Sequence, residues 1–294
     1  MQRLLITGAT GFVGAELTRH LLPDSEIWAV TRRIPEDADP RIRWILQDLS
    51  RGMPIIGLPR RIDAVIHLAQ SRDFRSFPAE APAIYNIAAD TTLKLLDWAC
   101  RAGAKRFVLA STGGLYGSSL EPVDEVTTEI PMPEGPLSFY FRSKKLAEDI
   151  ASAYSQELSV SILRYFFIYG SSQSPTMLMK RLLTNVTEGN PVQLQGDDGL
   201  LFNPVHISDA VRATASCALE DHPGVFNVAG PDIVSLRQVV EHLGGLTGTP
   251  PVIEHEENKT PHHLVASVRR ASQAFGAPRV TLDAGLADLA GADR

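Results

Sequence analysis

The chain has 294 residues, 44% hydrophobic and 21% charged, which is typical of a folded globular protein and excludes a disordered one. The formal net charge is −6 and no run of Lys and Arg is long enough to follow a phosphate backbone, so we do not expect a nucleic-acid partner. Cys100 and Cys217 are the two cysteines, which excludes a disulfide framework, and their spacing predicts no metal site.

A cytoplasmic location is expected from the same simple features. No stretch of about eighteen apolar residues is present to span a membrane. The N-terminal segment MQRLLITGATGFVG places glycines where a signal peptide needs an uninterrupted apolar core. We therefore predict no membrane association.

Strand-like and helix-like segments alternate through the first two thirds of the chain. The predicted strands are Arg3–Thr7, Glu26–Thr31, Trp44–Leu46, Ala64–Ala69, Arg106–Ser111 and Ser159–Tyr165, and the predicted helices are Phe12–Leu22, Thr91–Ala102 and Phe139–Gln156. Near-continuous apolar strands in this order predict an α/β fold with a doubly wound parallel sheet. Such a sheet binds ligands at the carboxyl ends of its strands.

This alternation ends after Tyr169 and Gly170. The remaining predicted elements are helices at Met177–Val186 and Leu236–Leu243 and extended segments at Pro191–Leu194 and Phe226–Val228. Glu254–Glu257 is expected to be a solvated charged stretch, and the last dozen residues to be loosely held. We predict a sheet domain of residues 1–170 plus 206–229 and a smaller lobe of residues 171–205 plus 230–294.

Gly8, Gly11 and Gly14 lie between the first strand and its helix, in TGATGFVG. Glycine allows a tight turn, and a phosphate can approach backbone N–H groups where no Cβ intervenes. The N-terminus of the following helix favours an anion. The motif predicts a dinucleotide-binding domain of the Rossmann type; a glycine-rich turn without a ligand is the alternative.

Thr31, Arg32 and Arg33 follow the second predicted strand, where an NAD site usually has a carboxylate for the ribose hydroxyl. A guanidinium instead binds a 2′-phosphate through paired hydrogen bonds, which favours NADP over NAD. Two solvated arginines are the alternative. Asp48 and Leu49 follow the third extended segment, where an acidic side chain can accept from the adenine amino group.

Tyr140 and Lys144 are four residues apart on a predicted helix and therefore share one face. A neighbouring ammonium favours the phenolate and is expected to lower the pKa of Tyr140. Such a tyrosine exchanges a proton with a hydroxyl or carbonyl while a hydride moves to or from a nicotinamide. Thr112 ends the preceding strand, where its hydroxyl can bond the reacting oxygen. An ordinary surface pair and a turn cap are the alternatives.

Together these motifs resemble the extended short-chain dehydrogenase/reductases, in particular the NAD(P)-dependent epimerase/dehydratase family that includes UDP-galactose 4-epimerase. The resemblance covers nearly the whole chain through TGATGFVG, HLAQ, LASTGGLYG, YFRSK, LRYF, NPVHISDA and FNVAGP, which occur in the family's order. It implies that the larger domain binds the dinucleotide, that the smaller lobe binds substrate, and that the protein is a homodimer.

The resemblance also implies roles for individual residues. It implies a catalytic set of Thr112, Tyr140 and Lys144, and a cofactor site of Gly8, Thr10, Gly11, Phe12, Val13, Gly14, Arg32, Arg33, Asp48, Leu49, Leu68, Ala69, Gln70, Tyr140, Lys144, Tyr165 and Phe166. It implies substrate contacts at Arg72, Thr112, Phe167, Phe202 and His206, although a structural role for His206 is the alternative.

Departures from the family pattern refine this interpretation. Sugar-nucleotide dehydratases carry Asp-Glu after the catalytic Thr, whereas this chain has Gly113 and Gly114, so dehydration is not expected. Phe167 and Phe202 replace an Asn and an Arg that grip the substrate diphosphate, which weakens but does not remove the assignment of a nucleotide sugar.

The expected activity is oxidoreduction of a sugar, with a nucleotide sugar as the expected substrate. Arg32 and Arg33 favour a keto-sugar reductase that uses NADPH. The alternatives are an epimerase with tightly bound NAD, and a non-catalytic NADP-sensing protein on the same fold.

Overall fold

The structure, a computed structural model, describes residues 1–51, 57–127, 132–256 and 259–291. The chain forms two compact units. The first unit consists of Met1–Leu115, Met132–Arg164 and Val211–Phe226, and the second of Tyr116–Pro131, Tyr165–Ala210 and Asn227–Arg294. These units divide the chain differently from the predicted domains, because residues 116–131, 165–170, 206–210 and 227–229 were predicted in the sheet domain and belong to the second unit. The assignment of substrate binding to the smaller lobe stays a prediction.

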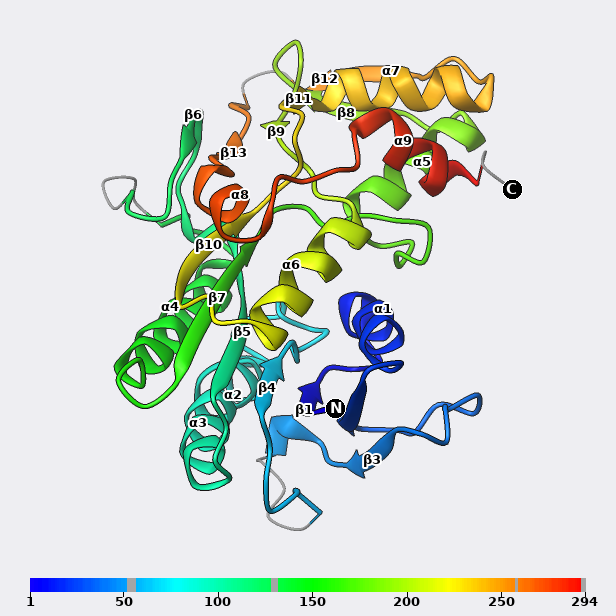
Figure 1. The fold of residues 1–294 in the computed structure, drawn as a ribbon. Helices are drawn as coiled ribbons and strands as arrows, with labels where there is room; N and C mark the ends of the chain where they lie inside the picture. Colours follow the sequence, from blue (N-terminus) through cyan, green and yellow to red (C-terminus); the bar gives the residue numbers. More distant parts are fainter. Residues whose placement is uncertain (52–56, 128–131, 257–258, 292–294) are drawn as a thin grey trace. The chain divides into compact units, whose positions relative to one another are not determined.

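Seven strands form the main sheet in the order β10-β7-β5-β4-β1-β2-β3 (Figure 1). Their bounds are β1 Gln2–Thr7, β2 Ser25–Thr31, β3 Arg43–Leu46, β4 Ala64–His67, β5 Arg106–Thr112, β7 Ser159–Tyr165 and β10 Gly224–Val228. The pairs β1-β2, β1-β4, β2-β3 and β4-β5 are parallel. This sheet confirms the α/β fold of the Rossmann type predicted from the sequence.

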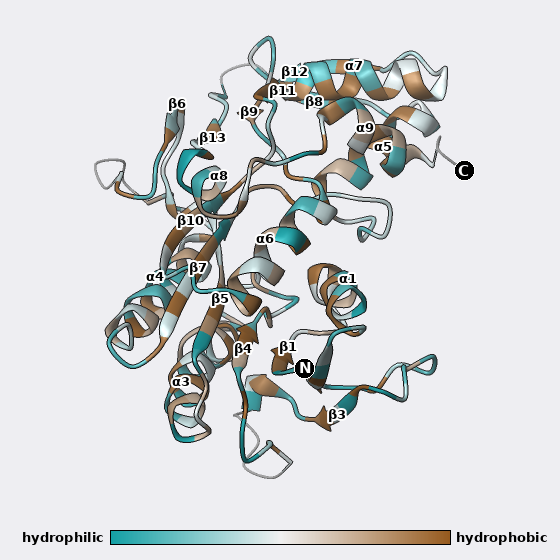
Figure 2. Cartoon of the chain, viewed as in Figure 1, coloured by the Kyte–Doolittle hydropathy of each residue, from teal (hydrophilic) through white to brown (hydrophobic). Residues whose placement is uncertain are grey.

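Helices and strands of the first unit share an apolar core. The helices are α1 Phe12–Leu21, α2 Ala81–Tyr85, α3 Thr91–Arg101 and α4 Ser138–Ala153, with a π-helix at Asn86–Asp90 and short 3-10 turns at Leu49–Arg51 and Gly113–Leu115. Leu96 of α3 and Ala147 of α4 pack with Phe107 of β5 in one buried cluster. Figure 2 shows the apolar residues concentrated along the central strands.

The second unit contains two smaller sheets and the remaining helices. Its elements are β6 Ser119–Val123, β8 Val192–Gln195, β9 Leu201–Phe202, β11 Val234–Ser235, β12 Ile253–Glu256, β13 Leu264–Ala266, α5 Leu178–Glu188, α7 Leu236–Thr247, α8 Arg269–Phe275 and α9 Leu282–Ala290. Strands β11-β9-β13-β6 form one sheet and β12-β8 the other. Helix α6, Ile207–Leu219, contributes residues to both units.

One expectation for the second unit holds and another is wrong. Residues 254–256 form part of strand β12 and pair in parallel with β8, and Glu254 and His255 are exposed, so the charged stretch is solvated as expected; Glu257 lies outside the described residues. The C-terminal segment is not loosely held through residue 290, because α9 buries Leu286 and Leu289 completely or nearly so. A Cβ at Gly285 would lie 2.0 Å from the Tyr169 hydroxyl, so the glycine allows this close packing.

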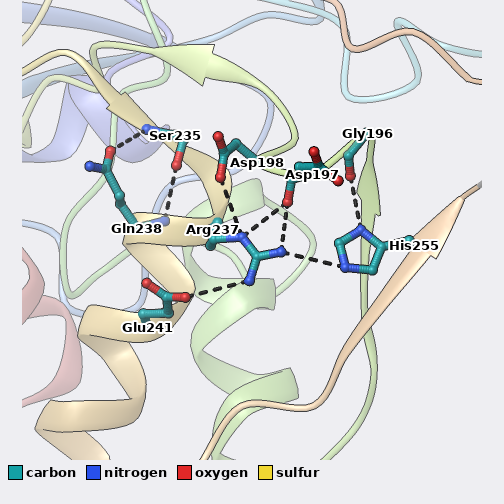
Figure 3. Close-up of polar contacts among 8 residues, drawn as sticks. All are labelled: Gly196, Asp197, Asp198, Ser235, Arg237, Gln238, Glu241 and His255. Atoms are coloured by element: carbon teal, nitrogen blue, oxygen red, sulfur yellow. Dashed lines mark hydrogen bonds and ion pairs between the residues drawn. The ribbon is translucent and has the colours of Figure 1, made fainter.

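A polar cluster joins the start of α7 to the turn between β8 and β9 (Figure 3). The Arg237 guanidinium donates to the carbonyl oxygen of Asp197 from Nε and Nη2 at 3.0 and 2.8 Å. It also contacts His255 Nε2 at 3.4 Å. Ser235 and Gln238 form a capping box at the same helix end, so backbone and side-chain bonds together fix the beginning of α7.

Candidate active site

The glycine turn after β1 is a closely packed backbone feature. Gly8 has a φ of +73°, and a Cβ there would lie 2.8 Å from the backbone nitrogen of Ala69. A Cβ at Gly14 would lie 2.0 Å from the Gly8 carbonyl oxygen. Gly11 is the N-cap of α1 and no side chain caps that helix end. The turn therefore presents backbone N–H groups without steric obstruction, which fits the diphosphate of a dinucleotide.

The end of β2 carries the two arginines that are expected to contact a 2′-phosphate. Arg33 Nη2 pairs with Glu36 Oε1 at 2.9 Å, and both side chains are exposed. Arg32 is exposed and forms no ion pair with the residues that the structure describes. Thr31 Oγ1 donates to the Arg33 carbonyl oxygen at 2.9 Å and lies 3.4 Å from Thr10 Oγ1. Arg32 is thus available to an anionic ligand, while Arg33 has a competing carboxylate.

Asp48 directly precedes the 3-10 turn that follows β3. Its Oδ1 accepts from the backbone nitrogen and the hydroxyl of Ser50 at 3.1 and 2.8 Å. The Ser50 hydroxyl bond is the largest cause that lowers the pKa of Asp48, with a smaller contribution from Arg32. Leu49 is buried beside it. Asp48 is therefore an ionised acceptor, as an adenine amino group would require.

A buried histidine supports the strand ends around the glycine turn. His67 ends β4, and its Nε2 donates to the Ile87 carbonyl oxygen at 3.1 Å. Its Nδ1 therefore accepts from Thr7 Oγ1 at 2.6 Å, while Thr7 accepts from the backbone nitrogen of Ala69 at 3.3 Å. Burial lowers the pKa of His67 to about 3, and Lys144 adds to this. The imidazole is neutral and fixes the positions of Leu68 and Ala69, the predicted cofactor lining.

The structure brings Thr112, Tyr140 and Gln70 close together. The backbone N–H of Gly114 donates to Thr112 Oγ1 at 3.1 Å. The Tyr140 hydroxyl donates to Gln70 Oε1 at 2.9 Å, and Thr112 is the neighbour that most opposes the raised pKa of Tyr140. The predicted catalytic hydroxyl and phenol are therefore neighbours.

Lys144 does not act on Tyr140 in the way expected from the sequence. Its Nζ donates to the Ala110 carbonyl oxygen at 2.8 Å. Burial is the main cause of a raised pKa of Tyr140, and the charge that opposes it comes from Arg75. The expectation that Lys144 lowers the pKa of Tyr140 is therefore wrong. The buried phenol loses more solvation than the neighbouring protein groups restore. Burial also lowers the pKa of Lys144 to about 8.

A buried ion pair supports the helix that carries Tyr140 and Lys144. Arg164 donates from Nε and Nη2 to the two carboxylate oxygens of Glu148 at 2.9 and 2.6 Å. Ser111 Oγ donates to Glu148 Oε1 at 2.5 Å. These bonds join α4 to β5 and β7 directly behind the Thr112 end of β5. Glu148 was not a predicted site residue, although its spacing of four residues from Lys144 places both on the same helix face.

Aromatic residues on the loop after β4 pack beside the phenol. Phe74 lies 4.9 Å from Tyr140 between ring centroids, and Phe77 is stacked on Phe139 at 4.9 Å. The Arg75 guanidinium lies 4.8 Å from the centroid of Phe74. Arg75 was not a predicted site residue; its position shortly after a strand's carboxyl end is the signal that could have identified it.

The second unit contains the other predicted site residues, and their roles stay predictions. Phe166 is fully buried and stacks on Tyr116 at 6.0 Å. Phe167 has a φ of +43° and packs edge-on against the fully buried Phe202 at 5.0 Å. Tyr165 ends β7 and is half-buried.

His206 has structural partners within this unit. Its Nδ1 lies 2.8 Å from Ser208 Oγ, and its Nε2 lies 3.2 Å from Asp288 Oδ2. Both imidazole nitrogens therefore have partners in the protein, which supports the structural role given as the alternative.

Arg72, a predicted substrate contact of the first unit, is exposed on the loop after β4.

Neither a metal centre nor a membrane span emerges from the described ranges. No group of three or more His, Cys, Asp or Glu side chains there could hold a metal ion. No helix in those ranges is long and apolar enough to cross a bilayer.

Comparison with known proteins gives consistent relatives over almost the whole chain. A dTDP-glucose 4,6-dehydratase from Streptomyces griseus is 30% identical over 97% of this chain and 92% of its own length. A UDP-glucuronate 4-epimerase from Thermodesulfobacterium geofontis is 28% identical over 83% of this chain and 80% of its own. The solved structure of MoeE5 in complex with UDP-glucuronic acid and NAD has a TM-score of 0.84 at 31% identity and covers 98% of both chains.

These names bear on the expected activity. The relatives are named as an epimerase and a dehydratase, so they favour the epimerase alternative over the keto-sugar reductase. A family model described as "NAD dependent epimerase/dehydratase family" matches residues 4–229. The chain is therefore an enzyme of the NAD-dependent epimerase/dehydratase family.

Proposed function

We propose that this enzyme is an NAD-dependent epimerase of a nucleotide sugar. The observation that carries the proposal is the placement of the Tyr140 hydroxyl, which donates to Gln70 Oε1 at 2.9 Å and has Thr112 at the end of β5 as a polar neighbour, with Lys144 on the same helix as Tyr140. One hydroxyl and one phenol suffice for the proton transfers when a single carbon is oxidised and then reduced again, and bound NAD would supply the hydride acceptor and donor. The relatives named as 4-epimerases and the UDP-sugar complexes of MoeE5 support a nucleotide sugar as the substrate.

Epimerisation requires a proton and a hydride to leave the substrate and both to return. When bound, NAD supplies the hydride acceptor and later the donor, so the reaction has no net oxidation. Tyr140 as phenolate takes the proton of the sugar hydroxyl, and Thr112 holds that oxygen. After the ketone turns its other face to the hydride, Tyr140 returns the proton to the carbonyl oxygen.

Dehydration has less support in the geometry after Thr112. A water elimination needs a further acid and base, which the dehydratases carry directly after the catalytic threonine. Here a Cβ at Gly114 would lie 2.3 Å from Cε1 of Phe141, so an acidic side chain at this position would displace the aromatic ring. Gly113 is also buried.

NAD is the cofactor that we propose, on the basis of the glycine turn and of the NAD held by MoeE5. Arg33 is paired with Glu36, which weakens the case for a 2′-phosphate. Arg32 favours a second candidate, a reductase that uses NADPH, because its guanidinium is exposed and forms no ion pair with the described residues. The two candidates differ in whether NADPH is consumed.

One experiment separates these activities. The purified enzyme, with no cofactor added, is incubated in D₂O with UDP-glucuronic acid or UDP-glucose, and products are followed by proton NMR. We expect the epimer, without deuterium at the epimerised carbon, because the hydride returns from NAD. A deoxy-keto sugar would instead establish the dehydratase. In a parallel incubation with a UDP-4-keto sugar and added NADPH, stoichiometric consumption of NADPH would establish the reductase.

A tyrosine variant tests the assignment of the proton carrier. Tyr140→Phe removes the hydroxyl, and we expect turnover to fall by about 10²–10⁴-fold, as for other general acid–base groups. Tyr85→Phe is the matched control, because Tyr85 is 46% exposed on α2. Equal turnover in both variants would show that Tyr140 does not carry the proton.

A further inference from the structure

The amide of Gln70 is directly bonded to the group that carries the proton. Gln70 lies three residues after the end of β4, and its Oε1 accepts from the Tyr140 hydroxyl at 2.9 Å. We propose that Gln70 is a positioning residue for Tyr140 in both protonation states, accepting from the phenol through Oε1 and donating to the phenolate through Nε2. The proposal rests on the proposed function, in which Tyr140 alternates between these states.

The surroundings of Tyr140 make such a partner necessary. The phenol packs in a cluster with Ile84, Leu115 and Phe141, and the ring of Phe74 lies against it. A phenolate in apolar surroundings loses its hydration, so a hydrogen-bond donor of the protein must replace the lost water. Thr112 provides one such donor, and a rotated Gln70 amide provides a second.

One charged group near Tyr140 shares this task with the neutral partners, and the others are bonded elsewhere. Arg75, on the loop between β4 and α2, is the charged side chain that acts on the phenol, and it lies over Phe74. Lys144 on α4 is bonded to the Ala110 carbonyl oxygen, while Glu148 on the same helix is bonded to Arg164. His67, at the end of β4, is neutral and bonded to Thr7 and Ile87.

Only a side chain with a donor and an acceptor on one arm can serve both states. The carboxamide of glutamine has both, and a half-turn of its end group exchanges them. Gln70 is exposed at the surface, so this rotation is not prevented by close packing. A leucine would serve neither state, and an ionised glutamate would serve only the phenol.

The test is a titration of Tyr140 in the purified holoenzyme. Ultraviolet difference absorbance detects tyrosinate, and the Tyr140→Phe variant supplies the baseline for the other tyrosines. We expect Gln70→Leu to raise the apparent pKa of Tyr140 by about 1 unit and Gln70→Glu by about 2 units, because a donor is lost in the first and a negative charge is added in the second. Gln156→Leu is the matched control, since Gln156 is exposed after α4.

Kinetics provides the second measurement. The acid limb of the kcat/KM profile reports the phenolate, so it should move to higher pH in the same order, with Gln156→Leu unchanged. Wild-type titration and an unshifted limb in both Gln70 variants would overturn the proposal. The spectroscopic titration needs no sugar substrate, so it tests Gln70 even if the proposed epimerase activity fails.

Discussion

Two arginines, one in each unit, form ion pairs with carboxylates in very different surroundings. Arg164 and Glu148 have side chains that are 10% and 3% exposed, and their two hydrogen bonds join β7 to α4. The Arg237 side chain is 29% exposed, and its contacts with Asp198 and Glu241 are longer, at 3.3 and 3.5 Å. The buried pair holds α4, the helix that carries Tyr140 and Lys144. The partly exposed contacts of Arg237 lie at the start of α7 (Figure 3).

The comparison teaches that burial, rather than the number of contacts, sets the consequence of breaking a pair. A buried charge that loses its partner keeps its full desolvation cost. An exposed charge that loses its partner is solvated by water and screened by salt. The two arginines therefore predict opposite extremes of mutational effect, and variants of His67 and Lys144 extend the same reasoning to other buried groups.

Removing the buried arginine should have the largest effect. Arg164→Met leaves the Glu148 carboxylate without its charge partner, and we expect the free energy of unfolding to fall by about 3–5 kcal/mol. Urea denaturation followed by circular dichroism measures the change. The double variant Arg164→Met with Glu148→Leu should recover much of the loss, because no unpaired charge remains. A single-variant loss below about 1 kcal/mol would contradict the comparison.

His67 extends the same reasoning to acid conditions. Its pKa is lowered from 6.5 to about 3, so below pH 6.5 the unfolded chain binds a proton that the folded chain does not. Its contribution to stability is complete above about pH 6.5 and decreases as pH falls towards 3. We expect a loss of about 2 kcal/mol between pH 6.5 and 5 from this group alone.

Denaturation at a series of pH values measures this loss. The His67→Gln variant should show a shallower decline, because it has no imidazole to protonate. Parallel curves for the variant and the wild type would show that other groups cause the acid sensitivity.

The buried ammonium of Lys144 is expected to lower the stability of the folded chain at neutral pH. Its ammonium is buried, with a pKa lowered to about 8, so at pH 7 the folded chain holds a poorly solvated charge. Lys144→Met should raise the free energy of unfolding by about 1–2 kcal/mol at pH 7, because methionine carries no buried charge. Turnover should fall, because the resemblance places Lys144 in the catalytic set. The wild type gains stability between about pH 8 and 10.5 as the amine loses its proton, so the advantage of the variant should shrink there. A destabilised variant at pH 7 would contradict this account.

Much of the first unit could be predicted from local patterns. The strand Ser159–Tyr165 was predicted with its observed bounds, and the glycine turn after β1 has the close contacts expected for a phosphate site. The bond of Gln70 to Tyr140 could not be predicted, because it joins residues 70 positions apart. The bond from the Lys144 amine to the Ala110 carbonyl oxygen could not be predicted either, because helical spacing shows which face a side chain shares but not which group it bonds.

The second unit was harder to predict because its elements are short and depend on long-range packing. Strand β9 has two residues and pairs with the two residues of β11, so neither contains a recognisable alternation. Strand β12, in which His255 lies between two charged residues, is identified as a strand by its pairing with β8. In such segments tertiary contacts outweigh local propensity.

Arg237 provides the smallest expected effect and completes the comparison. Arg237→Met removes two hydrogen bonds to the Asp197 carbonyl oxygen, and also exposed ion pairs whose individual contributions are about 0–1 kcal/mol. The capping box of Ser235 and Gln238 remains and continues to fix the start of α7. We expect a change in the free energy of unfolding of about 1 kcal/mol or less, with turnover unchanged. Because salt screens exposed ion pairs, the difference in free energy of unfolding between Arg237→Met and the wild type should shrink in 1 M salt. The difference for Arg164→Met should persist. Equal salt sensitivity of the two variants would contradict the distinction between the buried and the partly exposed arginine.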